Sequence, residues 1–269
     1  MILCANPLAQ FQSYQAEIEE AVLTVMRGNR YVLGDEVFSL EQEFADYVGT
    51  TAAVGVANGT DAIELSLRAL GIGSSDEVIT VSHTAVATVA AVEAVGASPV
   101  LVDVESQFYT LNPSQLEEVT TSKTKAVIVV HLYGQAANME AIQSFCCKHN
   151  LFLIEDVSQA NGAKYNGKRL GSIGDIGCFS CYPTKNLGAI GDAGLITTNN
   201  TNLATKIRML REYGWNERIS EFSGRNSRLD ELQAAILRVK LKYLDADNEK
   251  RRQLAQYYTA NLSDSQASP

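Results

Sequence analysis

The sequence predicts an α/β fold built on a largely parallel β-sheet that is flanked by helices. From about residue 52, short runs rich in β-branched residues alternate with helical segments, the pattern of βαβ units. Two runs, KAVIVVHL from Lys125 and LFLIED from Leu151, are almost continuously apolar, as strands covered on both faces must be. We therefore expect these two runs at the centre of the sheet.

The other elements follow from the same patterns. Strands are expected at residues 52–57, 77–81, 98–103, 125–132, 151–156, 176–181 and 193–198. Helices are expected at residues 60–70, 84–95, 113–120, 138–149 and 201–214. A last helix is expected to open near Ser227, which stands three residues before Asp230 as in a capping box, and to continue past 30 residues without Gly or Pro.

Composition limits the classes of partner. The chain has 269 residues, of which 46% are hydrophobic, enough for one large core or for a large and a small one. Its net charge of -9 argues against nucleic acid and against an anionic membrane surface. The start, MILCANPLAQ, lacks a basic segment and is interrupted by Asn6 and Pro7, so we expect no signal peptide, no membrane span and a cytoplasmic location.

The five cysteines are expected to be reduced in that compartment. Cys178 and Cys181 form a C-x-x-C motif, which elsewhere marks a redox pair or half of a zinc site. Here the motif lies on a predicted strand, whereas a redox pair is expected at a helix start. We therefore interpret both residues as small core residues and expect no metal site.

In open α/β sheets, ligands bind beyond the carboxyl ends of the strands. After the first strand, Asn58 and Gly59 lead directly into a helix. Gly59 permits close approach to the backbone, and the amides of Thr60 and Asp61, with the helix dipole, favour an anion such as phosphate. The alternative is a plain helix start capped by Thr60 or Asp61.

Two carboxylates, Glu155 and Asp156, end a strand that should be buried. Burying a carboxylate costs several kcal/mol unless it is paired. Asp156 is thus expected to face a cation from a ligand or from a basic side chain, and a structural ion pair or helix cap is the alternative. Gln159 would lie on the same side if a turn of helix follows.

The stretch CFSCYPTK places Ser180 at a strand end and Lys185 just after a proline corner. Such a lysine is either a surface residue with a buried stem or an amine whose pKa is lowered for Schiff-base chemistry. The glycines at 188, 191 and 194 favour the second alternative, because they leave space around the amine for a planar ligand.

Taken together, these strand ends fit one ligand. It carries an anion for residues 59–61, a protonated ring nitrogen for Asp156 and an aldehyde within reach of Lys185. Pyridoxal 5'-phosphate (PLP) meets all three requirements. Farther along, Arg225, Asn226 and Arg228 precede the last helix and either bind an anion or cap that helix.

Several motifs in order resemble the DegT/DnrJ/StrS family of PLP-dependent sugar aminotransferases, which have the aspartate-aminotransferase-like architecture of fold-type I. The resemblance extends over residues 6–260 and includes RYVLGDEV, GVANGTDAIELSLRALGIGSSDEVIT, VIVVHLYGQAANMEAI, LIEDVSQANGA, GDIGCFSCYPTKNLGAIGDAG and NSRLDELQAAILRVKL. It implies a PLP-binding large domain over residues 1–240, and the beginning of a small C-terminal domain over residues 241–269.

The resemblance also implies roles for the residues singled out above. Lys185 resembles the lysine that binds the cofactor aldehyde, and Asp156 resembles the partner of the pyridine nitrogen. Gln159 resembles the residue near the cofactor 3'-oxygen. Ser180 and the turn of Gly59, Thr60 and Asp61 resemble the phosphate-binding residues. Asn226 resembles a phosphate ligand that the neighbouring subunit donates, which implies a homodimer.

One motif departs from the family pattern. Many members carry an aromatic residue that stacks on the cofactor where this chain has Ala85. His83 is the alternative stacking residue, or else a residue at a helix start, and the sequence leaves both interpretations open.

The implied activity is transfer of an amino group from glutamate or glutamine to a nucleotide-linked keto sugar, in amino-deoxysugar biosynthesis for cell-surface polysaccharides or antibiotics. One alternative is a PLP-type sugar dehydratase, although family members of that kind replace the lysine with histidine. The other is an inactive or truncated regulator that keeps the fold.

Overall fold

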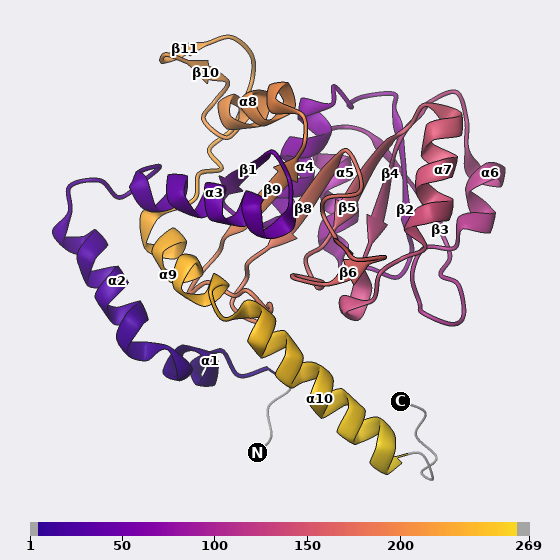
Figure 1. Cartoon of the computed structure of the whole chain (residues 1–269). Helices are drawn as coiled ribbons and strands as arrows, with labels where there is room; N and C mark the ends of the chain where they lie inside the picture. The colour runs from indigo at the N-terminus through magenta and orange to yellow at the C-terminus, as the bar shows by residue number, and fades with distance from the viewer. Residues whose placement is uncertain (1–4, 263–269) are drawn as a thin grey trace.

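The computed structural model describes residues 5–262 and is built around a seven-stranded sheet (Figure 1). The strands are β1 (Ala52–Val56), β2 (Glu77–Val81), β3 (Ser98–Val102), β4 (Thr124–Val130), β5 (Phe152–Asp156), β8 (Ile176–Ser180) and β9 (Gly194–Thr198). Their order is β1-β9-β8-β5-β4-β2-β3, and only β9 runs antiparallel to its neighbours. The predicted strands and the largely parallel sheet are confirmed, with β4 and β5 in the interior of the sheet.

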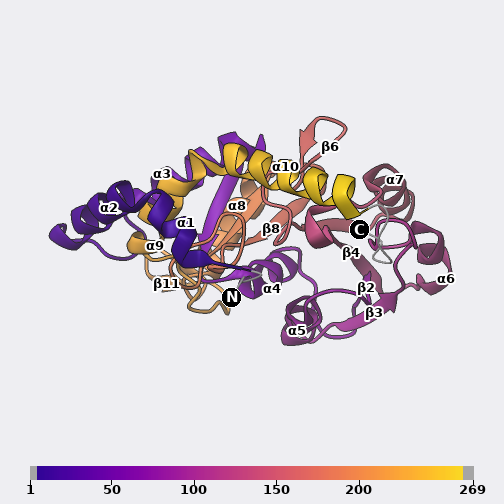
Figure 2. The same ribbon diagram turned by 90° about the horizontal axis from the view of Figure 1, so that it is seen from below.

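Helices cover both faces of this sheet. The longer ones are α2 (Gln15–Arg27), α3 (Asp35–Val48), α4 (Gly59–Ala69), α5 (Val86–Ala94), α7 (Met139–His149), α8 (Thr201–Leu210), α9 (Glu231–Leu241) and α10 (Leu244–Leu262). In Figure 1, α3 and α7 lie in front of the sheet and α4 and α5 behind it, and the view from below in Figure 2 shows the same layers. The fold is thus an α/β sandwich of three layers.

Shorter elements complete the chain. They are α1 (Pro7–Ser13), the 3-10 helices η1 (Pro113–Gln115) and η2 (Leu132–Gly134), α6 (Leu116–Val119), the hairpin β6 (Lys164–Tyr165) with β7 (Lys168–Arg169), and the hairpin β10 (Trp215–Asn216) with β11 (Ile219–Ser220). Neither hairpin was predicted, nor were the three helices before residue 50. Cys4 and the last part of the predicted small domain, residues 263–269, lie outside the described residues.

The prediction of one long C-terminal helix that opens near Ser227 is wrong in two respects. The segment forms two helices, α9 and α10, separated at Lys242 and Tyr243. The Tyr243 ring stacks on Tyr14 with 4.2 Å between the ring centroids, a tertiary contact that stabilises the break. Ser227 is not a cap, because α9 begins at Glu231 and the Ser227 hydroxyl instead accepts a hydrogen bond from the Ala57 amide at 3.2 Å.

The core is formed by side chains from both faces of the sheet. Phe179 of β8 contacts Phe44 of α3 edge to face, with 4.9 Å between the ring centroids, whereas Cys178 lies on the opposite face against α4. Cys178 and Cys181 are buried free thiols, as predicted, and burial raises the pKa of Cys181 to about 12. No helix within residues 5–262 combines the length and apolar character needed to cross a membrane.

A buried carboxylate from α9 fixes the start of α3. Glu231 accepts hydrogen bonds from the amides of Gly34 at 2.7 Å, Glu36 at 2.9 Å and Val37 at 3.0 Å. These amides belong to the first turn of α3, where no residue preceding in sequence provides a side-chain cap. An anion there also interacts favourably with the helix dipole. The N-terminal helices are therefore held by a residue far away in the sequence.

We expect Glu231→Gln to lower the free energy of unfolding by about 1–3 kcal/mol, because a neutral amide oxygen is a weaker acceptor and its NH₂ group faces backbone donors. Urea unfolding would measure this. The control is Glu249→Gln on α10, whose exposed carboxylate contacts Arg252 and Gln253 at the surface; this change should alter the free energy of unfolding by less than about 1 kcal/mol. Equal effects of the two changes would contradict the capping role.

Candidate active site

Most of the predicted site residues line one cavity of about 250 Å³ at the carboxyl ends of β4, β5 and β8. Six of them do so: Gly59, Thr60, Asp156, Gln159, Ser180 and Lys185. Asp61, His83 and Asn226 do not. The topology of the sheet explains the convergence, because parallel strands bring their carboxyl ends to one edge.

The start of α4 forms one wall. Asn58 is the helix cap, and its side chain accepts a hydrogen bond from the Asp61 amide at 2.8 Å. The predictions of a free Asp61 amide and of capping by Thr60 or Asp61 are therefore wrong. The Asp61 carboxylate is buried, and its oxygen lies 3.4 Å from the Arg225 guanidinium. Asp61 is therefore paired within the protein. Gly59 and Thr60 remain in the wall, at the positive end of the helix dipole.

The contact between Gly59 and Ser180 makes this wall tight. A Cβ atom on Gly59 would lie 2.6 Å from the Cβ of Ser180, closer than two carbon atoms can approach. A glycine is required there, and its backbone lies directly against the end of β8. The arrangement leaves a helix start and a serine hydroxyl beside each other, suited to a phosphate group.

Asp156 is a buried carboxylate without a cation. Its oxygens accept hydrogen bonds from the Ser158 amide at 3.1 Å and the Thr88 hydroxyl at 3.3 Å. No basic side chain pairs with it in the part of the chain that the structure describes, and no helix follows it, so neither an ion pair nor a helix cap accounts for it. A buried carboxylate of this kind favours a positively charged ligand group.

Gln159 lines the cavity although no helix turn follows β5, so the geometry on which its prediction depended is wrong while its location is right. Its side-chain oxygen accepts the Tyr133 amide at 2.9 Å. Tyr133 has a φ angle of 58°, in the left-handed region that non-glycine residues seldom adopt. The hydrogen bond holds this turn beside the cavity.

Glu155 faces away from the cavity, because successive side chains of a strand point to opposite faces. It is fully buried and accepts three amides of a single turn, from Gly171 at 2.9 Å, Ile173 at 2.8 Å and Gly174 at 2.8 Å, together with His131 Nε2 at 3.2 Å. Burial alone would raise the pKa of Glu155, but the hydrogen bonds from His131 and the amides hold that pKa below its ordinary value.

Lys185 follows the proline corner and is half-buried, and its amine has no hydrogen-bond or ion-pair partner within residues 5–262. The backbone after it is firmly held. The Gln233 side chain accepts from the Ile190 amide at 2.9 Å and donates to the Ile190 carbonyl at 3.1 Å. From α1, Gln10 donates to the Asn186 carbonyl at 2.9 Å. The amine is thus free while its backbone is fixed.

A buried amine, that of Lys240, contacts this turn. Lys240 of α9 donates to the Gly188 carbonyl at 2.6 Å and to the Gln10 side-chain oxygen at 3.0 Å. No carboxylate neutralises it within the described chain, and burial lowers its pKa to about 8. Sequence reasoning missed Lys240, Gln233 and Gln10, because each acts on a segment that is remote in the sequence.

His83 lies outside the cavity and its Nε2 is 3.0 Å from the Tyr133 hydroxyl. Helix α5 begins at Val86, so the interpretation of His83 as a helix-start residue is wrong, and stacking on a cofactor stays a prediction. Ala85 itself lines the cavity. Asn226 pairs through its backbone with Glu212, away from this chain's own cavity.

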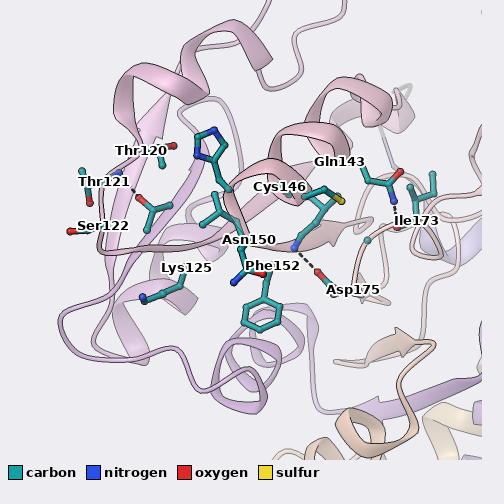
Figure 3. A pocket seen from close by; sticks show the side chains of 16 residues that line it. Thr120, Thr121, Ser122, Lys125, Gln143, Cys146, Asn150, Phe152, Ile173 and Asp175 are labelled. Carbon is teal, nitrogen blue, oxygen red and sulfur yellow. Dashed lines mark hydrogen bonds between the residues drawn. The ribbon is translucent and has the colours of Figure 1, made fainter.

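A larger cavity of about 770 Å³ lies at the amino ends of β4 and β5 (Figure 3). Its polar groups are largely occupied: Asp175 accepts the Leu153 amide at 2.8 Å, and Gln143 donates to the Ile173 carbonyl at 3.2 Å. None of the predicted site residues lines it. The smaller cavity, with its free amine and its unpaired carboxylate, is therefore the candidate active site.

The residues of the smaller cavity fit PLP. The phosphate would be held by Gly59, Thr60 and Ser180, the charged ring nitrogen would face Asp156, and the aldehyde would lie at Lys185. These assignments use groups that the protein leaves available at the cavity: a helix start, a cation-free carboxylate and an unpaired amine.

Comparison with known proteins agrees with this geometry. The model of the DegT/DnrJ/EryC1/StrS aminotransferase family matches residues 12–268. A dTDP-3-amino-3,6-dideoxy-alpha-D-galactopyranose transaminase from Aneurinibacillus thermoaerophilus is 51% identical over 250 residues, which cover 93% of this chain and 69% of the relative.

Comparison with solved structures also finds similarity to aminotransferases of this kind. Streptomyces venezuelae DesV in complex with a ketimine intermediate superposes with a TM-score of 0.94 at 44% identity, covering 96% of this chain and 70% of that one. Bacillus subtilis NtdA with bound cofactor PMP gives 0.89 at 33% identity, covering 94% and 58%. The predicted fold-type I architecture and the PLP cofactor are confirmed.

The buried amine of Lys240 predicts a pH dependence of stability. The pKa of Lys240 is about 8 in the folded chain, whereas the ordinary pKa of a lysine is 10.5. Between these values the unfolded chain holds more protons, so the free energy of unfolding rises with pH in this window. Relative to Lys240→Met, the wild type should gain about 2–3 kcal/mol from pH 7.5 to 10.5. Urea unfolding across this range would measure it.

The matched control is Lys242→Met, because Lys242 is exposed and its side chain is 3.7 Å from Glu17 at the surface. That variant should follow the wild-type pH profile. If the profiles of Lys240→Met and the wild type are parallel, Lys240 does not titrate in this range.

Proposed function

The chain belongs to the DegT/DnrJ/EryC1/StrS aminotransferase family, and we propose that it transfers an amino group from glutamate or glutamine to a nucleotide-linked keto sugar. Aminotransfer with PLP is the chemistry of this family. The observation that carries the assignment to these residues is the convergence of Lys185, Asp156 and the Gly59–Ser180 contact on one cavity.

The start of α4 and the end of β8 bind the phosphate. Gly59 and Thr60 contribute the positive end of the helix dipole, and Ser180 contributes a hydroxyl group. Because the backbone of Gly59 is packed on Ser180, the two segments cannot separate without opening the core. The phosphate thus anchors the cofactor in one orientation.

Asp156 keeps the pyridine nitrogen protonated. Its carboxylate is oriented by the Thr88 hydroxyl and the Ser158 amide, and its burial strengthens the attraction to a positive charge. When bound, the cofactor supplies an aldehyde that accepts the amino group and a ring that stores the electron pair left by the proton.

Lys185 would hold the cofactor through Nζ, and the same amine would remove the proton from the carbon that bears the amino group. Its side chain is suited to this role because no carboxylate within residues 5–262 pairs with it, and because Gln10 and Gln233 hold the backbone that follows it at Asn186 and Ile190. The same amine returns the proton to the acceptor in the second half of the reaction.

The proposed substrate follows from the relatives. The transaminase from Aneurinibacillus thermoaerophilus is named for a dTDP-linked amino sugar, and another relative, 45% identical, for a dTDP-linked trideoxy amino sugar. We place the reaction in the cytoplasm, where nucleotide-linked sugars are made. Lys185 favours aminotransfer over the dehydratase alternative, in which family members carry histidine.

We also propose a homodimer that shares the site. Asn226 would bind the phosphate of the neighbouring subunit. The N-terminal part of the chain exposes large apolar side chains that suit such an interface: Leu23, Met26, Tyr31 and Phe38. Residues 1–240 would form the large domain and residues 241–269 the beginning of the small one.

Reduction with borohydride after incubation with PLP should place a pyridoxyl group on Lys185, to be identified by peptide mass spectrometry. Lys185→Ala should lose this label and all turnover while keeping the far-ultraviolet circular dichroism of the fold. The exposed Lys242→Ala should label normally. Near wild-type turnover in Lys185→Ala would refute the assignment.

Asp156→Asn should still bind PLP but lower kcat by about two orders of magnitude or more, because the ring nitrogen loses its anionic partner. The exposed Asp46→Asn on α3 is the control and should leave kcat unchanged. Steady-state assays with saturating cofactor measure both. A wild-type kcat in Asp156→Asn would remove Asp156 from the mechanism.

A further inference from the structure

A further cavity, of about 300 Å³, lies on the other side of Thr184 and Lys185 from the candidate active site. Thr184 and Lys185 line both cavities. The second one lies between the proline corner, the segment that enters α1, and Arg251 of α10. An anionic group bound in it would therefore lie next to the residue at which the reacting carbon of a substrate is placed.

Charge distinguishes this cavity. No carboxylate is among its lining residues, and its two cations are Lys185 and Arg251. Arg251 makes one weak contact, to the Asn248 side-chain oxygen at 3.4 Å, and has no carboxylate partner within residues 5–262. The next residue, Arg252, instead pairs with Glu249 at 2.6 Å. Arg251 is thus a guanidinium left available to a ligand.

The remaining polar groups of the wall are mostly occupied. Gln10 uses both ends of its amide, donating to the Asn186 carbonyl and accepting from Lys240. The side-chain NH₂ group of Asn186 donates to the side-chain oxygen of Asn248 at 2.8 Å. Thr184 has an uncommitted hydroxyl in the described chain. Asn6 uses only its side-chain oxygen, which accepts from the Ala9 amide at 3.1 Å. The free donors of the cavity within residues 5–262 are therefore Arg251, Thr184, Lys185 and the Asn6 NH₂ group, a set that suits an anion.

We propose that this cavity, the Arg251 subsite, binds an anionic group of a substrate while the reacting carbon lies at Lys185. The inference rests on the proposed function, since both proposed substrates carry such a group: a carboxylate on the amino donor and a diphosphate on the sugar nucleotide. Because the two substrates occupy the site in turn, one guanidinium can serve either. Its planar donors match both carboxylate and phosphate oxygens.

The test compares Arg251→Gln with the matched neighbour Arg252→Gln in the cofactor-loaded chain. Calorimetric titration measures binding of two probes that cannot react, glutarate for the donor carboxylates and inorganic pyrophosphate for the diphosphate. Arg251→Gln should weaken at least one probe by about tenfold or more, the loss expected when a charge-assisted contact is removed. Arg252→Gln should stay within about twofold, and Arg251→Lys should retain part of the affinity.

Each outcome either assigns the Arg251 subsite to a substrate or rejects it. Loss for glutarate alone assigns the subsite to the donor, loss for pyrophosphate alone assigns it to the sugar nucleotide, and loss for both assigns it to both. Unchanged affinities in Arg251→Gln, equal losses in Arg252→Gln, or a wild type that binds neither probe would overturn the subsite. Borohydride labelling of Lys185 in the same samples separates the two proposals, because a normal label with unchanged probe binding rejects the subsite alone.

Discussion

The burial of Glu155 is the constraint on which the site depends. Its carboxylate is removed from water, so it must be satisfied within the protein, and three amides of the turn before β8 and the ring of His131 do this. That turn leads directly into β8 and so determines where Ser180 and Lys185 emerge. Since neighbouring side chains of a strand alternate, fixing Glu155 on one face also directs Asp156 to the other.

Helix α9 has a comparable role without lining the cavity. Three of its polar residues hold other segments: Glu231 binds the start of α3, Gln233 binds the turn after Lys185, and Lys240 binds the carbonyl of Gly188. Gln10 connects α1 to the same turn. The N-terminal helices, which a reader of the sequence would regard as peripheral, are thereby tied to the segment that carries the amine.

The sheet could be predicted well from the sequence because each strand is recognisable from its own residues, as an apolar and β-branched run between helices. It also located the residues at strand ends, since parallel topology makes these meet. What it missed depends on distant contacts. The break between α9 and α10 arises from Tyr14 stacking on Tyr243, and the cap of α3 comes from Glu231. Arg251 lies in an ordinary charged run, and what distinguishes it is that no carboxylate within residues 5–262 pairs with it.

The contact of Gly59 with Ser180 divides the cavity into a rigid part and an adaptable part. Where these two segments touch, even one additional carbon atom finds no room. Elsewhere in the lining, Ala85 contributes a small, exposed side chain just before α5, at the rim of the cavity and not in the core. Laboratory evolution of substrate range should therefore accumulate changes around Ala85 and leave the glycine wall invariant.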